Sequence, residues 1–315
     1  MKKLKIRVSL GTLEELGLVG DFKIVEKPMT AYLLQYSHSG CNGGCLFCLQ
    51  SRTLHSRYSG IRLGRVTWPS LELGEMLSKW RGVFKRICLQ TVIKPFFTTE
   101  ALEIIEAIRN VDNKTPFSLA ITPVSIDILR KAREIGVDTL GVGLDTFTEE
   151  LFKKWRKPYS WSSYLRFAEK AISIYGRGNV YVHLIAGLGE NFREAITLIK
   201  RLYYMGARVA LFNYVNEKGY PTTRIEYYRL IQIARYLVEN GVDPDEYIDY
   251  DTNKLIRRPQ LDLVEAFYTS GCPDCNRPFY NESPSGTIYN IPSRRLLDLY
   301  KNKLRAELAT IGVTI

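Results

Sequence analysis

The sequence is short of histidine and of long apolar runs, and each shortage excludes a class of protein. Only three of the 315 residues are histidine, and no two of them have zinc-ligand spacing. No apolar run approaches the roughly 18 residues that cross a membrane. The first residues, Met1 to Lys5, are basic like a signal peptide, but Arg7 and Glu14 interrupt any apolar region behind them. We therefore expect a cytoplasmic protein in which cysteine carries the metal chemistry.

The charge is basic, with 44 Lys and Arg against 33 Asp and Glu, a net charge of +11. A basic surface favours an acidic partner, either nucleic acid or an acidic protein domain. A Lys- and Arg-rich surface like that of a heat-stable protein explains the same charge without any partner. No arginine-rich tract or nucleic-acid module is present, so the sequence does not favour nucleic acid.

Three of the six cysteines stand in the run CNGGCLFC, at Cys41, Cys45 and Cys48. Three thiolates at this spacing bind three irons of a cubic [4Fe–4S] cluster and leave the fourth iron free to bind a small molecule. Ferredoxin-type runs use other spacings and a fourth cysteine. The alternative is three unrelated thiols in a loop. Positive φ angles at nearby glycines would let the backbone close around the cluster: these are Gly40, Gly43 and Gly44.

The spacing, with an aromatic residue before the last cysteine, resembles the signature of the radical S-adenosylmethionine (SAM) superfamily. The resemblance implies that Cys41, Cys45 and Cys48 ligate the cluster and that SAM chelates the open iron. It implies that reductive cleavage of SAM yields a 5′-deoxyadenosyl radical. It also implies that the backbone around Phe47 touches the adenine.

From about residue 30, short β-branched runs alternate with amphipathic stretches, which is typical of a parallel sheet with right-handed crossovers. The pattern predicts strands at 32–36, 84–92, 117–121, 138–144, 179–186, 208–214 and 246–250. It predicts helices at 70–81, 99–110, 125–135, 160–175, 191–205 and 223–240. No G-x-G-x-x-G follows the first strand. We therefore expect an α/β chain with a partial or nearly complete parallel (β/α) barrel of the radical SAM type.

The expected organisation is a leader over residues 1–29, the barrel over 30–251 and an irregular cap over 252–315. The cap is expected because the alternation stops near residue 252, where Pro, Asn and Arg become frequent. The cysteine run directly follows the first strand, and the loops after the strands form the active face of a β/α barrel.

The other cysteines are Cys88, in the second predicted strand, and the pair Cys272 and Cys275 in the cap. A C-x-x-C pair is a two-ligand clip for iron or zinc, and it also serves as a redox dithiol or a disulfide. Cys88 alone fits a small buried hydrophobe. A thiol on an inner strand and a clip on the cap predict a second, auxiliary [4Fe–4S] cluster at the barrel mouth.

Three further segments resemble biotin synthase. They are Arg86-Ile87-Cys88, Leu144-Asp145-Thr146 and the Gly-Leu-Gly-Glu element at 187–190, which lipoyl synthases share. The resemblance implies that Cys88 ligates an auxiliary cluster and that Asp145 holds SAM or substrate, where a helix cap is the plain alternative. It implies the same cofactor-binding role for Gly187, Gly189 and Glu190, whose alternatives are a turn and a helix cap.

The chain also departs from biotin synthase. Tyr181 stands where that enzyme has a cluster cysteine, and a rough alignment puts Asp249 at the position of its arginine ligand. A lone strand histidine such as His183 is more often structural. The segment 268–292 instead resembles biotin-synthase-like components of the archaeal two-protein lipoyl synthase. Ser270, Asn276 and Arg277 are candidates for a fourth auxiliary ligand.

These resemblances imply a sulfur-inserting enzyme, a lipoyl synthase component that acts on a protein-bound octanoyl chain. The auxiliary cluster held by Cys88, Cys272 and Cys275 would supply the sulfur. The implied partners are an octanoylated lipoyl carrier domain or peptide, a second lipoyl synthase protein, and ferredoxin or flavodoxin as electron donor. The alternatives are sulfur insertion into dethiobiotin, tRNA modification, and a non-catalytic iron–sulfur subunit.

Overall fold

The computed structural model describes residues 4–20, 26–54 and 60–314, and one sheet of eight strands organises them. The strand order is β10-β9-β8-β7-β6-β2-β1-β5. Consecutive strands from β2 to β10 in this order pair in parallel. Their bounds are Thr30–Gln35 for β2, Arg86–Gln90 for β6, Phe117–Ile121 for β7, Thr139–Asp145 for β8, Val180–Ala186 for β9 and Arg208–Asn213 for β10. The α/β fold with a partial parallel barrel is therefore as the sequence predicts.

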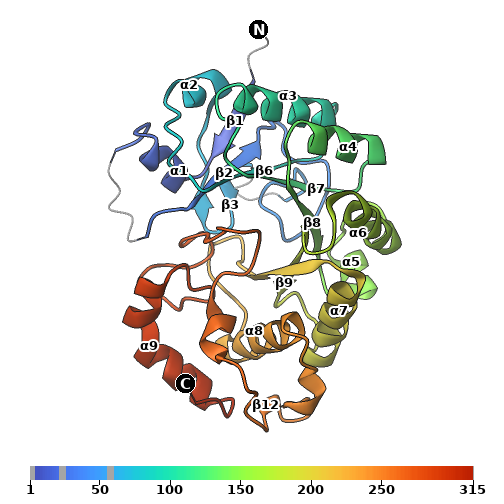
Figure 1. Ribbon diagram of the computed structural model, residues 1–315, viewed down its shortest axis with the longest axis vertical. Helices are drawn as coiled ribbons and strands as arrows, with labels where there is room; N and C mark the ends of the chain where they lie inside the picture. The colour runs from blue at the N-terminus through green and yellow to red at the C-terminus, as the bar shows by residue number, and fades with distance from the viewer. Residues whose placement is uncertain (1–3, 21–25, 55–59, 315) are drawn as a thin grey trace.

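Helices follow the strands and lie around the outside of the curved sheet (Figure 1). Their bounds are Leu73–Ser78 for α2, Phe97–Arg109 for α3, Ile126–Glu134 for α4, Glu149–Lys154 for α5, Trp161–Tyr175 for α6, Phe192–Met205 for α7 and Ile225–Glu239 for α8. The cap signals are strongest at α7, where Asn191 and Glu194 form a capping box. The predicted helices are confirmed to within a few residues at each end, except that the first is shorter.

Two helices start a few residues away from the predicted position, each for a local reason. Residues Ser70–Glu72 form strand β5, so helix α2 begins later than the expected residue 70. Helix α3 begins after Phe96, which has a left-handed φ of 58°, and so starts before the expected residue 99. At α2 the pairing of β5 with the sheet overrides the local helix propensity, and at α3 the left-handed residue sets where the helix begins.

The segment that was expected to be a leader contributes to the sheet. Strand β1 (Lys5–Val8) pairs antiparallel with β2 on one side and with β5 on the other. The short helix α1 (Leu10–Glu15) follows, and the side chain of Ser9 caps it. Residues 5–15 are therefore part of the folded body.

The seventh predicted strand is wrong. Only Ile248–Asp249 is extended, as β11, and it pairs with β12 (Lys254–Leu255) in a hairpin outside the main sheet. The preceding residues, Pro244–Glu246, form a 3-10 turn, which leaves too short a run to add a barrel strand. Among the described residues the main sheet therefore has no parallel strand after β10.

The C-terminal segment folds back over the barrel. After the 3-10 turn Leu263–Phe267, the chain makes a long loop, forms a bridge between Tyr268 and Ile291, and ends in helix α9 (Arg294–Ala309). In Figure 1 this loop lies beside the first strands, and the phenol of Tyr32 on β2 accepts a hydrogen bond from the backbone N–H of Arg277 at 2.9 Å. The loop thus reaches the strand that precedes the cysteine run.

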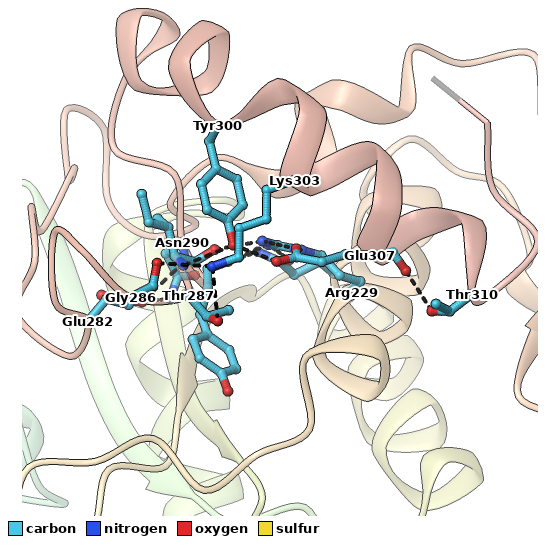
Figure 2. A network of polar contacts seen from close by, with 12 residues as sticks. Arg229, Glu282, Gly286, Thr287, Asn290, Tyr300, Lys303, Glu307 and Thr310 are labelled. Carbon is cyan, nitrogen blue, oxygen red and sulfur yellow. Dashed lines mark hydrogen bonds and ion pairs between the residues drawn. The ribbon is translucent and has the colours of Figure 1, made fainter.

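A buried ion pair fixes this loop between helices α8 and α9 (Figure 2). Arg229 on α8 is 0% exposed and pairs with Glu307 on α9 at 2.9 Å. The same guanidinium donates to the backbone oxygens of Ile288 and Tyr289 at 2.6 and 2.7 Å. One side chain therefore holds both the last helix and residues 288–289 of the loop.

Within the described residues, the helices are all too short or too polar to pass through a bilayer.

Candidate functional site

The cysteine run forms a closed loop at the end of β2. The backbone N–H of Cys41 donates to Gln50 at 2.6 Å, and Arg52 donates back to Cys41 at 3.1 Å, so the loop's two ends are joined. Its tip is attached elsewhere, because the N–H of Leu46 donates to Trp155 just after α5 at 3.0 Å. The three thiols are therefore presented by a loop that is anchored at both its base and its tip.

Two of the three expected glycine conformations are confirmed. Gly40 has φ +78° and Gly44 has φ +74°, and a Cβ on Gly40 would lie 3.1 Å from the backbone oxygen of Gln50. Gly43 does not have a positive φ, which corrects the expectation for that residue; a Cβ there would approach the Cys41 sulfur at 3.3 Å. Gly43 thus clears space at a thiol, whereas Gly40 and Gly44 turn the backbone.

The environment of these thiols suits their binding to a metal cluster as thiolates. The N–H groups of Gly43 and Ile93 point at the Cys41 sulfur at 3.3 and 3.2 Å, as they would toward a thiolate. Burial raises the pKa of Cys45 to about 11 and that of Cys48 to about 12, and neighbouring thiols add to both shifts. Buried thiols of this kind become thiolates when a metal binds them, because the metal replaces the protons. The three residues therefore fit the [4Fe–4S] cluster.

A single metal ion fits less well. Across residues 4–20, 26–54 and 60–314, no three His, Cys, Asp or Glu side chains are grouped closely enough to hold one ion. A cubic cluster binds each thiolate at a different iron, so its ligands lie further apart than those of one ion.

An aromatic wall lies beside the loop. The ring of Phe47 packs edge-on against Trp155 at 6.0 Å, and Trp155 packs against Tyr214 at 5.6 Å. The indole of Trp155 donates to the backbone oxygen of Leu188 at 2.8 Å, which joins this wall to the Gly-Leu-Gly-Glu turn. Sequence reasoning selected Phe47 and missed the other two, since nothing marks a Trp or a Tyr in a loop as facing a site.

Glu190 shapes the glycine turn from within. Its carboxylate accepts the backbone N–H groups of Gly187, Leu188 and Gly189 at 2.7 to 3.1 Å. The next helix is capped by Asn191, so the helix-cap alternative for Glu190 is wrong. Gly187 and Gly189 have φ of +99° and +121°, as the turn alternative expects. A direct role for these residues in cofactor binding stays a prediction.

Asp145 forms a buried ion pair that the sequence did not suggest. Its carboxylate lies 2.5 Å from the ammonium of Lys157, whose side chain is 5% exposed and also donates to the oxygen of Gly143 at 2.8 Å. Burial opposes the charge of Lys157, but the Asp145 carboxylate outweighs it and raises the pKa of the lysine. Asp145 has φ +68° and does not cap α5, a task that Thr148 performs. The pair places a fixed cation and anion beside Phe47.

A cavity of about 260 Å³ opens inside the barrel, and both cysteine groups reach it. Cys48 lines one part of the wall, and Asp145 and His183 also face the space. The second group lines it as well: Cys88, Cys272 and Cys275. The loop cysteines and the second cysteines therefore border one common space.

The second cysteine group is assembled by the fold. All three thiols line the common cavity, and Cys88 and Cys275 pack against the same small apolar cluster. Burial, and then the charges of Cys272 and Cys275, raise the pKa of the Cys88 thiol. Burial raises the pKa of Cys272 to about 11, although hydrogen bonds from Ser118 and Thr139 oppose the shift. The sequence expectation that these thiols lie together agrees with this geometry.

Of the three candidates for a fourth auxiliary ligand, only Arg277 faces the thiols. Its Nη1 lies 3.4 Å from the Cys275 sulfur, and its guanidinium stacks on Phe212 at 4.0 Å. The hydroxyl of Ser270 instead accepts the N–H of Leu211, and the amide of Asn276 binds the backbone on both sides.

Two positions from the biotin synthase comparison have different outcomes. Tyr181 lines a second hollow together with Ser270 and Gly271, the residues that precede Cys272, and not the common cavity. Burial, and then Cys272, raise the pKa of Tyr181 to about 12. Asp249 belongs to β11, outside the sheet, and binds the backbone of Asp251 and the hydroxyl of Thr252. Its alignment with an auxiliary ligand is therefore wrong.

The comparisons with known proteins agree with this fold and site. A profile described as the radical SAM superfamily matches residues 36–202, which is more than half of the chain. The chain belongs to the radical SAM superfamily. Membership implies an enzyme with a [4Fe–4S] cluster and SAM, and the cysteine run lies within the matched residues. No curated protein matches the sequence.

Solved structures share the fold at low sequence identity. Methylornithine synthase (PylB) is 17% identical with a TM-score of 0.51, over 67% of this chain and 63% of that one. HydG, the [FeFe]-hydrogenase maturase of Carboxydothermus hydrogenoformans, is 13% identical with a TM-score of 0.51, over 93% and 70%. Another HydG structure is 12% identical with a TM-score of 0.50, over 67% of this chain and half of that one. These likenesses concern the fold alone.

Proposed function

We propose that this enzyme inserts sulfur into an octanoyl chain carried by a protein, as one component of a lipoyl synthase. The observation that carries the proposal is the common cavity: Cys48 of the SAM-cluster loop and the second cysteine group line the same space. A radical made on one side would meet a sulfur source on the other without leaving the barrel.

The second group has the donors that an auxiliary [4Fe–4S] cluster needs. Cys88, Cys272 and Cys275 would be three ligands, and Arg277 is the side chain placed to be the fourth or to hydrogen-bond a thiolate. When bound, such a cluster supplies the sulfide that replaces a hydrogen of the acyl chain. The biotin-type arrangement is not favoured, because Tyr181 stands where that enzyme has a cluster cysteine.

The residues around the loop would orient SAM. The ammonium of Lys157 suits the carboxylate of SAM, and Asp145 suits a ribose hydroxyl. The aromatic wall of Phe47, Trp155 and Tyr214 suits a stacked adenine, and the turn at Gly187 and Gly189 lets the backbone approach it. Each of these groups is held before any ligand binds, which favours a preorganised site.

The partners follow from the same chemistry. The substrate would be an octanoylated lipoyl carrier domain or peptide, and the net charge of +11 would favour an acidic domain over a neutral one. A second lipoyl synthase protein would complete the reaction, and ferredoxin or flavodoxin would supply the electron. The basic charge would equally attract RNA, so a tRNA substrate is the competing outcome of the test.

The test is product mass after anaerobic reaction with SAM, a reductant and a short peptide that carries octanoyl-lysine. We expect the substrate to gain the mass of one sulfur for each thiolated carbon. Dethiobiotin and tRNA serve as parallel substrates under the same conditions. A thiolated product from either of these, with none from the peptide, contradicts the proposal.

A further inference from the structure

Two polar side chains in the cavity wall have no hydrogen-bond partner within the described residues. Trp68 and Asn213 are each only 1% exposed, and both line the main cavity. The indole N–H of Trp68 is unpaired, as are both the oxygen and the nitrogen of the Asn213 amide. Buried polar groups in native proteins are nearly always paired, so three orphaned atoms in one cavity wall point to a ligand.

The two side chains belong to the same part of the wall. Trp68 packs edge-on against Tyr280 at 5.6 Å, and the next residue, Asn281, donates its amide to the backbone oxygen of Asn213 at 3.3 Å. Asn213 is the last residue of β10, so it lies at the carboxyl edge of the sheet, where ligands enter such folds. Residues 280–281 of the C-terminal loop therefore join the orphaned groups.

The chemistry of the orphaned atoms specifies what fits them. An asparagine amide offers an oxygen acceptor and an NH2 donor group, and the indole adds one N–H donor. A ligand that matches this set must both accept and donate, as a carboxamide or peptide amide does. An ester or a carboxylate lacks the N–H that Asn213 Oδ1 would accept.

We propose that Trp68 and Asn213 form a subsite for an amide group of the substrate. This proposal rests on the proposed function, in which the amide is the one that joins the octanoyl chain to its lysine. Because this amide is planar and trans, its two polar groups lie on opposite edges: the N–H donates to the Asn213 oxygen, and the carbonyl accepts from the Trp68 indole. The acyl chain then lies along the apolar part of the cavity wall: Leu49, Leu63, Ile185, Ala210 and Phe212.

The subsite has a consequence for the order of reactions. It favours an acyl chain that is already attached through an amide over the free acid or an ester. A reaction that forms the acyl-lysine amide must therefore come before the step catalysed by this chain.

The test is a binding titration with the cluster-loaded protein and SAM but without reductant, so that no turnover occurs. The ligands are a peptide with octanoyl-lysine and the same peptide with an ester in place of that amide. We expect the wild type to bind the amide peptide about tenfold more tightly, the effect of about 1.4 kcal/mol from added hydrogen bonds. Asn213→Leu is expected to bring this ratio close to one, whereas Trp68→Phe should weaken the binding of both peptides, because both keep the carbonyl that accepts from the indole.

Thermal unfolding separates a lost subsite from a damaged fold. Asn213→Leu removes a buried unpaired amide, so we expect its unfolding midpoint to rise by about 2–4 °C while amide binding weakens. Asn113→Leu, the same change at an exposed asparagine, is the control and should leave the binding ratio unchanged.

Three results would overturn the proposal. If the wild type binds the amide and ester peptides equally well, the subsite proposal fails. The proposed function still stands in that case if the thiolated product forms. Weaker SAM binding by Asn213→Leu, with an unchanged peptide ratio, would assign the subsite to adenine, which also donates and accepts. If neither peptide binds and no thiolated product forms, the proposed function itself has failed.

Discussion

The two cysteine groups are built in opposite ways. Cys41, Cys45 and Cys48 come from one eight-residue run, and backbone hydrogen bonds within and beside that run hold its loop closed. Cys88 lies on β6, whereas Cys272 and Cys275 come from a loop that reaches the barrel only after the chain has completed α8. The first site is local in sequence, and the second exists only when the C-terminal segment is docked.

This difference predicts different vulnerabilities. The loop site depends on β2 and the first strands of the barrel, which are close to the cysteine run in the sequence. The second site depends on the contacts of the C-terminal loop, chiefly the Arg229–Glu307 pair and the hydrogen bonds of Arg229 to residues 288–289. A change at the cysteine run should therefore impair SAM cleavage, and a change at the C-terminal loop should impair sulfur insertion while SAM cleavage continues.

The largest expected effect is at the loop. Cys45→Ala removes one of three protein ligands, so the SAM-binding cluster should be lost and SAM cleavage should fall to background. The measurement is 5′-deoxyadenosine formation after anaerobic reconstitution and reduction. Near-normal SAM cleavage by this variant would contradict the assignment of the loop site.

A change in the second group should have a narrower effect. We expect Cys275→Ala to keep SAM cleavage, because the loop cluster is intact, but to lose the thiolated product for want of a sulfur source. Product mass and 5′-deoxyadenosine are measured in the same reaction. Equal loss of both would show that the two groups do not act separately.

The docking of the C-terminal segment is tested through its buried ion pair. Glu307→Gln leaves the buried Arg229 charge unpaired, so we expect the free energy of unfolding to fall by about 3–5 kcal/mol. Asp127→Asn breaks the exposed pair with Arg130 and is the matched control, with an expected change of about 0–1 kcal/mol. Chemical denaturation measures both.

The same variant sharpens the comparison of the two sites. Glu307→Gln should lose iron from the second group before iron from the loop as denaturant increases. Simultaneous loss of all iron would contradict the idea that the second site depends separately on the C-terminal docking.

The smallest effect concerns acid stability. Burial lowers the pKa of His183 to about 4, from an ordinary value near 6.5. As the pH falls, this histidine is therefore protonated in the unfolded chain before it is protonated in the folded one. The free energy of unfolding keeps its full value above about pH 6.5 and decreases, by up to about 3 kcal/mol, as the pH falls toward 4. His183→Gln in the metal-free chain should reduce this loss. An unchanged pH profile would show that His183 is not held neutral.

The sequence predicts the parts that are local. The cysteine run, the order of the strands from β2 to β10 and most helix positions depend on spacing and periodicity within short segments. The pairing of β1 with β2 and β5 was missed, because a four-residue strand has no periodic signal of its own. The prediction of a strand at 246–250 was wrong. The apolar residues there resemble a strand in the sequence, but the turn at Pro244–Glu246 leaves a run too short to join the main sheet.

The candidate site follows the same rule. Phe47 was found because it lies inside the motif, whereas Lys157, Trp155 and Tyr214 were not, since each reaches the site from a loop after a helix or strand. The neighbouring positions of Cys88 and the C-x-x-C pair were expected from the placement of Cys88 on an inner strand and of the pair on the cap, together with the resemblance to biotin synthase. Contacts between segments so far apart in sequence leave no local pattern to read.

The central claim is that one chain holds two iron–sulfur clusters, one local and one assembled by docking. The most direct measurement is iron and sulfide content, with Mössbauer spectra, after anaerobic reconstitution of the wild type and of the double variant Cys272→Ala/Cys275→Ala. Two cubic clusters predict about eight irons in the wild type and about four in the variant. About four irons in both would contradict the claim and remove the sulfur source on which the proposed function depends.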